Sequence, residues 1–94
     1  MNERDIERYL VKRVREAGGE VRKVKWIGRN GAPDRFVMLL DGTGREPPTS
    51  WWVELKAPGK LPTPAQAREH DRMRQCGMKV ITIDSLEWVD WLVS

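Results

Sequence analysis

The sequence predicts one α/β domain with a central mixed four-stranded sheet flanked by helices, in the order α-β-β-β-α-β-α. Segments with helical periodicity alternate with short apolar runs, and glycine or proline separates them. A strongly capped helix separates the last two apolar runs, which makes those two strands parallel. The 94 residues span a single domain, 1–94, whose core is too small to enclose a large organic cofactor.

The first helix is expected over residues 3–17. Ile6, Leu10 and Val14 recur at the spacing of one helical face. Asn2 stands where an N-cap belongs, because its side chain can accept a hydrogen bond from the first turn. This segment therefore has one apolar face for a core.

Short apolar or alternating segments predict the strands and a closing helix. The loops between the first three strands are short, which predicts an antiparallel meander. The expected strands are 20–27, 35–40, 51–57 and 78–83, the loops are 28–34 and 41–50, and the closing helix is 84–93.

The second helix has the clearest boundary in the sequence. Thr63 is the predicted N-cap, Pro64 occupies the first helical position, and Gln66 completes a capping box. The helix runs to about Cys76, where Gly77 ends it.

Composition narrows the class of protein. A net charge of +3 and a pI near 9.4 permit a polyanionic partner. The single cysteine, Cys76, excludes an internal disulfide and a multi-cysteine metal site. We see neither a signal peptide nor an apolar run of about 20 residues. We therefore expect a cytoplasmic protein with no membrane contact.

Two acids of the first helix fall within its apolar arc. At about 100° per residue, Glu3 and Glu7 lie beside Leu10 and Val14 rather than with the basic residues. Favourable interaction with the helix dipole explains Glu3 at the N-terminus. Glu7 lies deeper among apolar residues, so it is the better candidate for a functional acid.

Charged residues also occupy strand positions. Asp34 opens the second strand, and Glu54 and Lys56 share one face of the third strand. If these strands pair, Asp34 lies near the level of Glu54, and two close carboxylates repel unless a cation separates them. Oxygen ligands suit Mg²⁺ or Mn²⁺, and a neighbouring lysine can orient a water molecule. This is the chemistry of phosphodiester hydrolysis; each pair alone is also explained by a turn or a solvated strand face.

The segments "GAPDRFVMLL", "WWVELKAPGKLPTPAQ" and "IERYLVKRVREAGG" resemble the VRR-Nuc (virus-type replication-repair nuclease) domain, in its stand-alone phage-type form. This family belongs to the PD-(D/E)xK nuclease superfamily, whose motif matches Pro33-Asp34 and Glu54-Leu55-Lys56. The resemblance covers nearly the whole chain. It implies a restriction-endonuclease-like fold and a metal-dependent nuclease.

Site residues follow from the resemblance position by position. Asp34, Glu54 and the carbonyl of Leu55 would bind the metal ion, and Lys56 would be the catalytic lysine. The helix acid would be Glu7, which agrees with the helical phase and leaves Glu3 as the alternative.

Gln66 matches a glutamine that follows the third strand in the family. The capping box already explains this side chain, so both a catalytic and a purely structural role stay open.

Basic residues gather around the predicted site and could contact phosphates. An ordinary charged surface explains them equally well. They are Arg22, Lys23, Lys25, Arg29 and Arg35, with Lys60 and Arg68 farther along the chain.

The tryptophans and the lone histidine carry weaker signals. Trp88 and Trp91 are expected in the core or in a dimer interface. One of Trp51 and Trp52 should be core, and the other should line the cleft or a subunit interface. His70 is expected at the surface.

We therefore predict a Mg²⁺- or Mn²⁺-dependent endonuclease that acts on branched DNA. The family resemblance further implies a homodimer similar to Holliday junction resolvases, since a two-fold dimer matches a junction with two symmetric cleavage points. A flap or other structure-specific nuclease, and a DNA-binding module without activity, are the alternatives.

Overall fold

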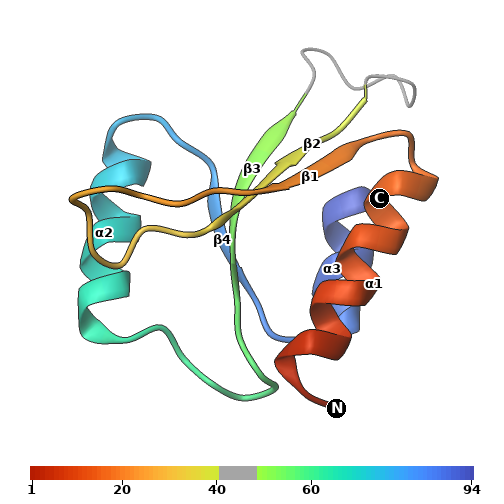
Figure 1. Ribbon diagram of the computed structural model, residues 1–94, viewed down its shortest axis with the longest axis horizontal. Helices are drawn as coiled ribbons and strands as arrows, with labels where there is room; N and C mark the ends of the chain where they lie inside the picture. The colour runs from red at the N-terminus through yellow and green to blue at the C-terminus, as the bar shows by residue number, and fades with distance from the viewer. Residues whose placement is uncertain (41–48) are drawn as a thin grey trace.

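A computed structural model describes residues 1–40 and 49–94. The elements follow the predicted order, and the strands form one sheet in the order β1-β2-β3-β4 (Figure 1). The elements are α1 (Glu3–Glu16), β1 (Glu20–Lys23), β2 (Arg35–Met38), β3 (Ser50–Leu55), α2 (Pro64–Gln75), β4 (Val80–Ile83) and α3 (Leu86–Val93).

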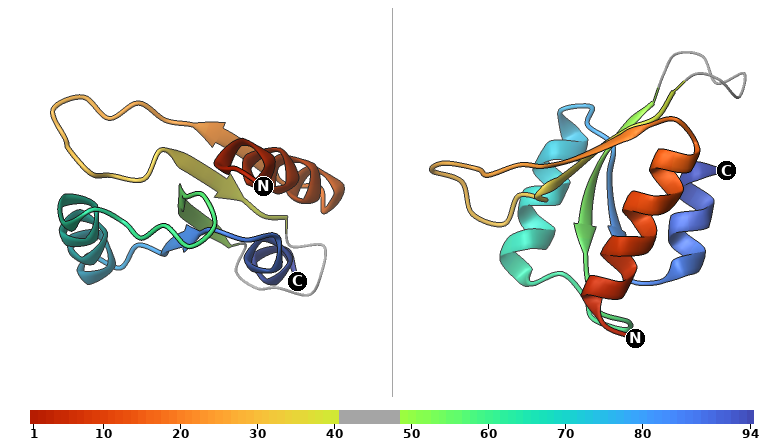
Figure 2. Two further views of the ribbon diagram at one scale, coloured as in Figure 1. Left: turned by 90° about the horizontal axis from the view of Figure 1, so that it is seen from below. Right: turned by 45° about the vertical axis from the view of Figure 1, so that its right-hand side comes forward.

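The pairing of the strands confirms the predicted topology. β1, β2 and β3 form an antiparallel meander, and β4 runs parallel to β3 after the α2 crossover. Helices α1 and α3 lie together on one side of the sheet, while α2 lies on the other (Figures 1 and 2). The sheet is therefore covered on both faces, but by different amounts of helix.

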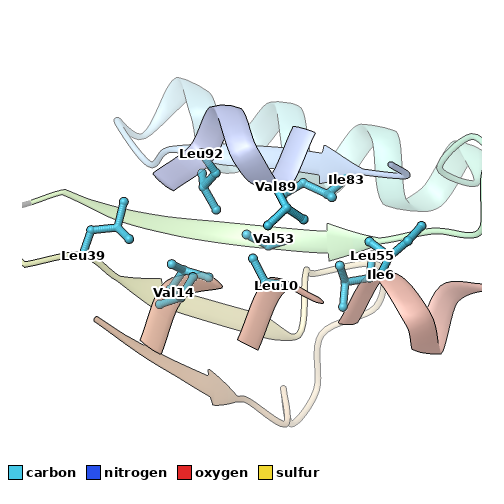
Figure 3. Close-up of a cluster of buried hydrophobic side chains, with 10 residues drawn as sticks. Ile6, Leu10, Val14, Leu39, Val53, Leu55, Ile83, Val89 and Leu92 are labelled. Atoms are coloured by element: carbon cyan, nitrogen blue, oxygen red, sulfur yellow. The ribbon is translucent and has the colours of Figure 1, made fainter. Parts of the chain in front are cut away.

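The main core lies between the sheet and the α1–α3 pair (Figure 3). The predicted apolar face of α1 is confirmed, because Ile6, Leu10 and Val14 are fully buried. Val53 and Leu55 of β3 point into the same core, so Trp52 and Glu54 point to the side of the sheet that faces α2. Alternation along β3 thus separates the structural residues from the charged ones.

Several elements are shorter than predicted at their ends. The expected strand 20–27 ends at Lys23, although Val24 N still donates to Asp34 O at 2.8 Å. Beyond Val24 the next bond to the facing segment comes from a side chain, since the indole Nε1 of Trp26 donates to Pro33 O at 2.8 Å. Met78 and Lys79, expected in the fourth strand, precede β4, and the N–H of Met78 instead donates to Met73 O at 3.0 Å across the turn that follows α2.

The second strand is shorter than predicted at its C-terminal end, and the third, predicted as 51–57, begins one residue earlier and ends at Leu55. β2 stops at Met38 rather than at residue 40, and Leu39 N continues the pairing by donating to Thr49 O at 2.9 Å. The expected turn 41–50 falls largely on residues 41–48, which lie outside the described residues, and Ser50 is the first residue of β3.

The predicted helix caps are confirmed. Asn2 Oδ1 accepts from Asp5 N at 3.0 Å, and Thr63 Oγ1 accepts from Gln66 N at 3.2 Å. Gln66 Oε1 returns the bond by accepting from Thr63 N at 2.9 Å, which completes the capping box.

The segment between β1 and β2 docks on α2. Gly31 has a φ of +82°, and a Cβ built there would lie 2.8 Å from the carbonyl oxygen of Ala65. Two residues before it, the Arg29 side chain reaches α2, where its Nε donates to Glu69 Oε2 at 3.0 Å. This docking sets the path of the chain that leads into Asp34, the first residue of the candidate site.

Replacing Gly31 by alanine should destabilise the protein more than the same change at Gly28. Both glycines have positive φ, so each variant pays about 1–2 kcal/mol for the left-handed backbone. Only at Gly31 does the new Cβ also meet backbone, because nothing lies within 4 Å of the one built at Gly28. Urea unfolding should therefore show a larger loss of unfolding free energy for Gly31→Ala than for Gly28→Ala. Equal losses would show that the docking is loose.

Candidate active site

Asp34 and Glu54 lie opposite each other across the β2–β3 pair. The register pairs Arg35 with Val53, so the next residue on each antiparallel strand brings Asp34 opposite Glu54. The Asp34 side chain is 46% exposed, whereas that of Glu54 is only 12% exposed. The site therefore has one open and one buried carboxyl group.

Burial raises the pKa of Glu54 to about 7. The charge of Lys56, the residue directly after β3, opposes this effect, while the charges of Asp34 and Glu3 add to it. Lys56 is half-buried, and its backbone N–H donates to Ile83 O at 3.0 Å, which extends the β3–β4 ladder past Leu55. The lysine is thus held at the end of the strand that carries Glu54.

His70 enters this site from α2, contrary to the expectation that it lies at the surface. Its side chain is only 1% exposed, and its Nε2 lies 3.5 Å from Glu54 Oε1. The imidazole also hydrogen-bonds to the backbone of Gly31, and burial lowers its pKa. Nε2 has no hydrogen-bond partner among the described residues. Because α2 carries few apolar residues, its sequence pattern did not mark the buried face that holds His70.

Arg35 pairs with acids from two elements. Its Nη2 contacts Glu7 of α1, and its Nη1 lies 2.9 Å from Asp34 Oδ1. The Asp34 contact is an ion pair without a well-aligned hydrogen bond, since Nη1 has none within the described residues. The Arg35 side chain is 11% exposed. This guanidinium was predicted as a DNA contact, and in this conformation it neutralises the acids.

The two helix acids take different positions. Glu7 reaches Asp34 only through Arg35, on the side of the sheet that α1 covers. Glu3 is exposed in the first turn of α1, and its charge acts on Glu54. The choice between them as the helix acid stays a prediction.

The remaining predicted site residues have defined places. The Leu55 side chain is buried in the core, so only its backbone can serve the site. Gln66 is held in the capping box, and Lys60 and Arg68 are exposed. Lys23, Lys25 and Arg29 line a groove of about 560 Å³, and Asp34 is part of the same lining.

The donor set fits a divalent ion in its chemistry. Within the described ranges, 1–40 and 49–94, no three His, Cys, Asp or Glu side chains gather closely enough to hold a metal ion by themselves. Arg35 accounts for part of this, because it separates Glu7 from Asp34. The raised pKa of Glu54 nevertheless reflects a carboxyl group without enough positive charge around it, which a cation beside it would supply.

The fold and this site define the class: a nuclease fold of the PD-(D/E)xK type, a class whose members generally use divalent metal ions. No family model matches the chain. It is 45% identical over 85 residues, 90% of this chain and 85% of the other, to "Putative nuclease p44" of Acyrthosiphon pisum secondary endosymbiont phage 1. A solved structure titled "VRR_NUC domain" superposes with a TM-score of 0.79 and 38% identity, covering 97% of this chain and 92% of the other.

The chain therefore belongs to the VRR-Nuc family of nucleases, in its phage type. The family resemblance and the restriction-endonuclease-like fold that it implied are confirmed. None of the described helices has the length and apolar character needed to span a bilayer.

Ionisation of Glu54 should destabilise the metal-free protein. Between pH 4.5 and 7 the folded chain keeps a proton on Glu54 that the unfolded chain releases, so raising the pH favours unfolding. We expect the unfolding free energy of the wild type, relative to Glu54→Gln, to fall as the pH rises through this window. Urea unfolding of both proteins in EDTA at several pH values measures the difference. A difference that stays level across the window would contradict the burial of this carboxyl group.

Proposed function

We propose that this protein is a Mg²⁺- or Mn²⁺-dependent endodeoxyribonuclease that cleaves branched DNA as a homodimer, in the manner of a Holliday junction resolvase. The observation that carries the catalytic part is the position of Asp34 opposite the buried Glu54, with Lys56 directly after the strand that carries Glu54. Two acids and a lysine at the end of neighbouring strands can hold a cation and position a water molecule.

Asp34 and Glu54 would hold the ion, with the carbonyl of Leu55 and with Glu7 or Glu3 completing the set. When bound, the ion supplies a Lewis acid that lowers the pKa of a water molecule and offsets charge on the phosphate. Lys56 orients the attacking water and stabilises the negative charge that develops on the phosphoryl oxygens. Arg35 and the ion compete for Asp34, since both bring positive charge to the same carboxylate.

The basic groove offers a path for the DNA backbone to the acids. Lys23, Lys25 and Arg29 line it together with Asp34. A phosphate chain in this groove would meet three cations beside the Asp34 carboxylate. Lys60 and Arg68, both exposed, would extend the contact along the loop after β3 and on α2.

The homodimer is proposed from size and from exposed aromatic surface. A domain of 94 residues presents a short DNA-binding surface, and a two-fold axis would double it to match a junction. Trp88 and Trp91 are not in the core, since they are 47% and 52% exposed with ring centroids 5.6 Å apart. Exposed neighbouring indoles of this kind are typical of an interface.

Cleavage assays test the catalytic proposal directly. With Mg²⁺ or Mn²⁺ the wild type should cut a synthetic four-way junction faster than a flap or a linear duplex, and EDTA should abolish cleavage. Lys56→Ala should lower the rate at least 100-fold, because the developing charge loses its cation. The matched control Lys12→Ala, on α1, should keep the wild-type rate.

Each other outcome of this assay has a defined meaning. Preferred cleavage of the flap would favour a flap nuclease. Binding without cleavage by a folded sample would favour a DNA-binding module, and cleavage in EDTA would overturn the metal-dependent proposal. Sedimentation at several concentrations tests the dimer, which a strictly monomeric sample would exclude.

Salt dependence tests the groove. Lys25→Gln should weaken junction binding in EDTA and lower the slope of log affinity against log salt by about 1, because one phosphate contact is lost. Lys12→Gln is the matched control and should leave the slope unchanged. An unchanged slope for Lys25→Gln would show that the DNA takes another path.

A further inference from the structure

A second depression adjoins the basic groove and shares two of its walls. It has a volume of about 310 Å³ and lies between the loop that follows β1, strand β3 and the end of α2. Trp26 and Arg29 line both the groove and this second depression, which we call the aromatic pocket. Its other apolar walls come from Trp52, Met73 and Met78.

Aromatic rings form one side of the aromatic pocket. The Trp26 and Trp52 ring centroids are 5.0 Å apart, and those of Phe36 and Trp52 are 4.6 Å apart. The Trp26 indole is fixed, since its Nε1 donates to Pro33 O at 2.8 Å. Trp26 is nevertheless 36% exposed. A rigid and partly open ring is a good stacking surface, because little conformational entropy is lost when a ligand binds.

The aromatic pocket lies one step along the sheet from the acids. Trp52 and Glu54 share a strand face two residues apart, which is about 7 Å in an extended strand. On β2, Phe36 lies opposite Trp52, just as Asp34 lies opposite Glu54. A polymer whose reacting group lay at the acids would therefore place its next side group near the aromatic rings.

Two arginines flank the aromatic pocket at fixed positions. Glu69 is 4% exposed, with Oε2 accepting from Arg29 Nε at 3.0 Å and Oε1 accepting from Arg72 Nη2 at 2.8 Å. One carboxylate between two guanidinium groups leaves this side of the pocket net positive. An apolar aromatic pocket with a cationic rim suits a planar base on an anionic backbone.

We propose that the aromatic pocket binds one unpaired nucleobase next to the scissile phosphate, stacked on Trp26 and contacting Trp52. This inference rests on the proposed function. It adds a reason for selectivity toward branched DNA, because a base at a branch or bulge leaves its stack at lower cost than a paired one. The basic groove would then bind the phosphate backbone, and the aromatic pocket would bind the unpaired base.

Cys76, the chain's single cysteine, allows a test without substitution. It is exposed and lines the aromatic pocket, so a bound base should cover its thiol. The reaction of Cys76 with the disulfide reagent DTNB is followed in EDTA with three ligands at saturation: a duplex with one bulged adenine, the same duplex with an abasic bulge, and a paired duplex. We expect the bulged adenine alone to slow the reaction, by roughly tenfold.

Binding of the same ligands is measured by fluorescence anisotropy. The bulged adenine should bind roughly tenfold more tightly than the abasic bulge, as expected when one base stacks on aromatic rings. Trp26→Leu should remove this preference, and the exposed apolar control variant Leu40→Ala should keep it. Circular dichroism shows whether each variant is folded. If Trp26→Leu does not fold, the protection of Cys76 in the wild type still tests whether a base occupies the aromatic pocket.

The outcomes separate this inference from the proposed function. Equal protection by the adenine and abasic bulges, with DNA bound and cleaved, would overturn the base pocket and leave the nuclease intact. Absence of binding to any DNA would overturn the proposed function itself. Protection of Cys76 that grows with protein concentration in the absence of DNA would show that a second copy of the chain covers the pocket, which also overturns the inference.

Discussion

The register between β2 and β3 holds the core and the candidate site together. Val37 and Val53 are fully buried, so a slip by one residue would move the apolar side chains of the shifted strand to the opposite face of the sheet. The same register brings Asp34 opposite Glu54. The free energy of core packing therefore opposes the repulsion between the two carboxyl groups, and the acids need no attraction of their own to stay close.

Positive charge around the acids is distributed unevenly. Arg35 serves Asp34 and Glu7, while Glu54 has mainly Lys56, whose charge does not outweigh the effect of burial on its pKa. Burying a carboxyl group without a full partner costs stability. Proteins tolerate such a cost mainly at functional sites, which is consistent with a cation-binding role for Glu54.

The sequence was informative where a local pattern coincides with the fold. Periodicity in α1, the capping box at Thr63 and the alternation in β3 predicted the elements, the meander and the meeting of Asp34 with Glu54. Strand ends were harder, since they depend on where a partner strand stops. Trp26 leaves the ladder for a contact with Pro33 that no periodic pattern contains.

The burial of His70 depends on contacts between segments that are distant in the sequence, so local patterns could not predict it. His70 lies on α2, a helix with a largely polar surface. The loop between β1 and β2 docks on this helix through Gly31 and Arg29, and His70 is buried there beside Glu54. Helix α2 therefore connects the parallel strands β3 and β4, contacts the loop that leads to Asp34, and places His70 beside the buried Glu54. A change at the α2 surface can thus reach the acids through the loop, because the loop and Glu54 share His70 as a neighbour.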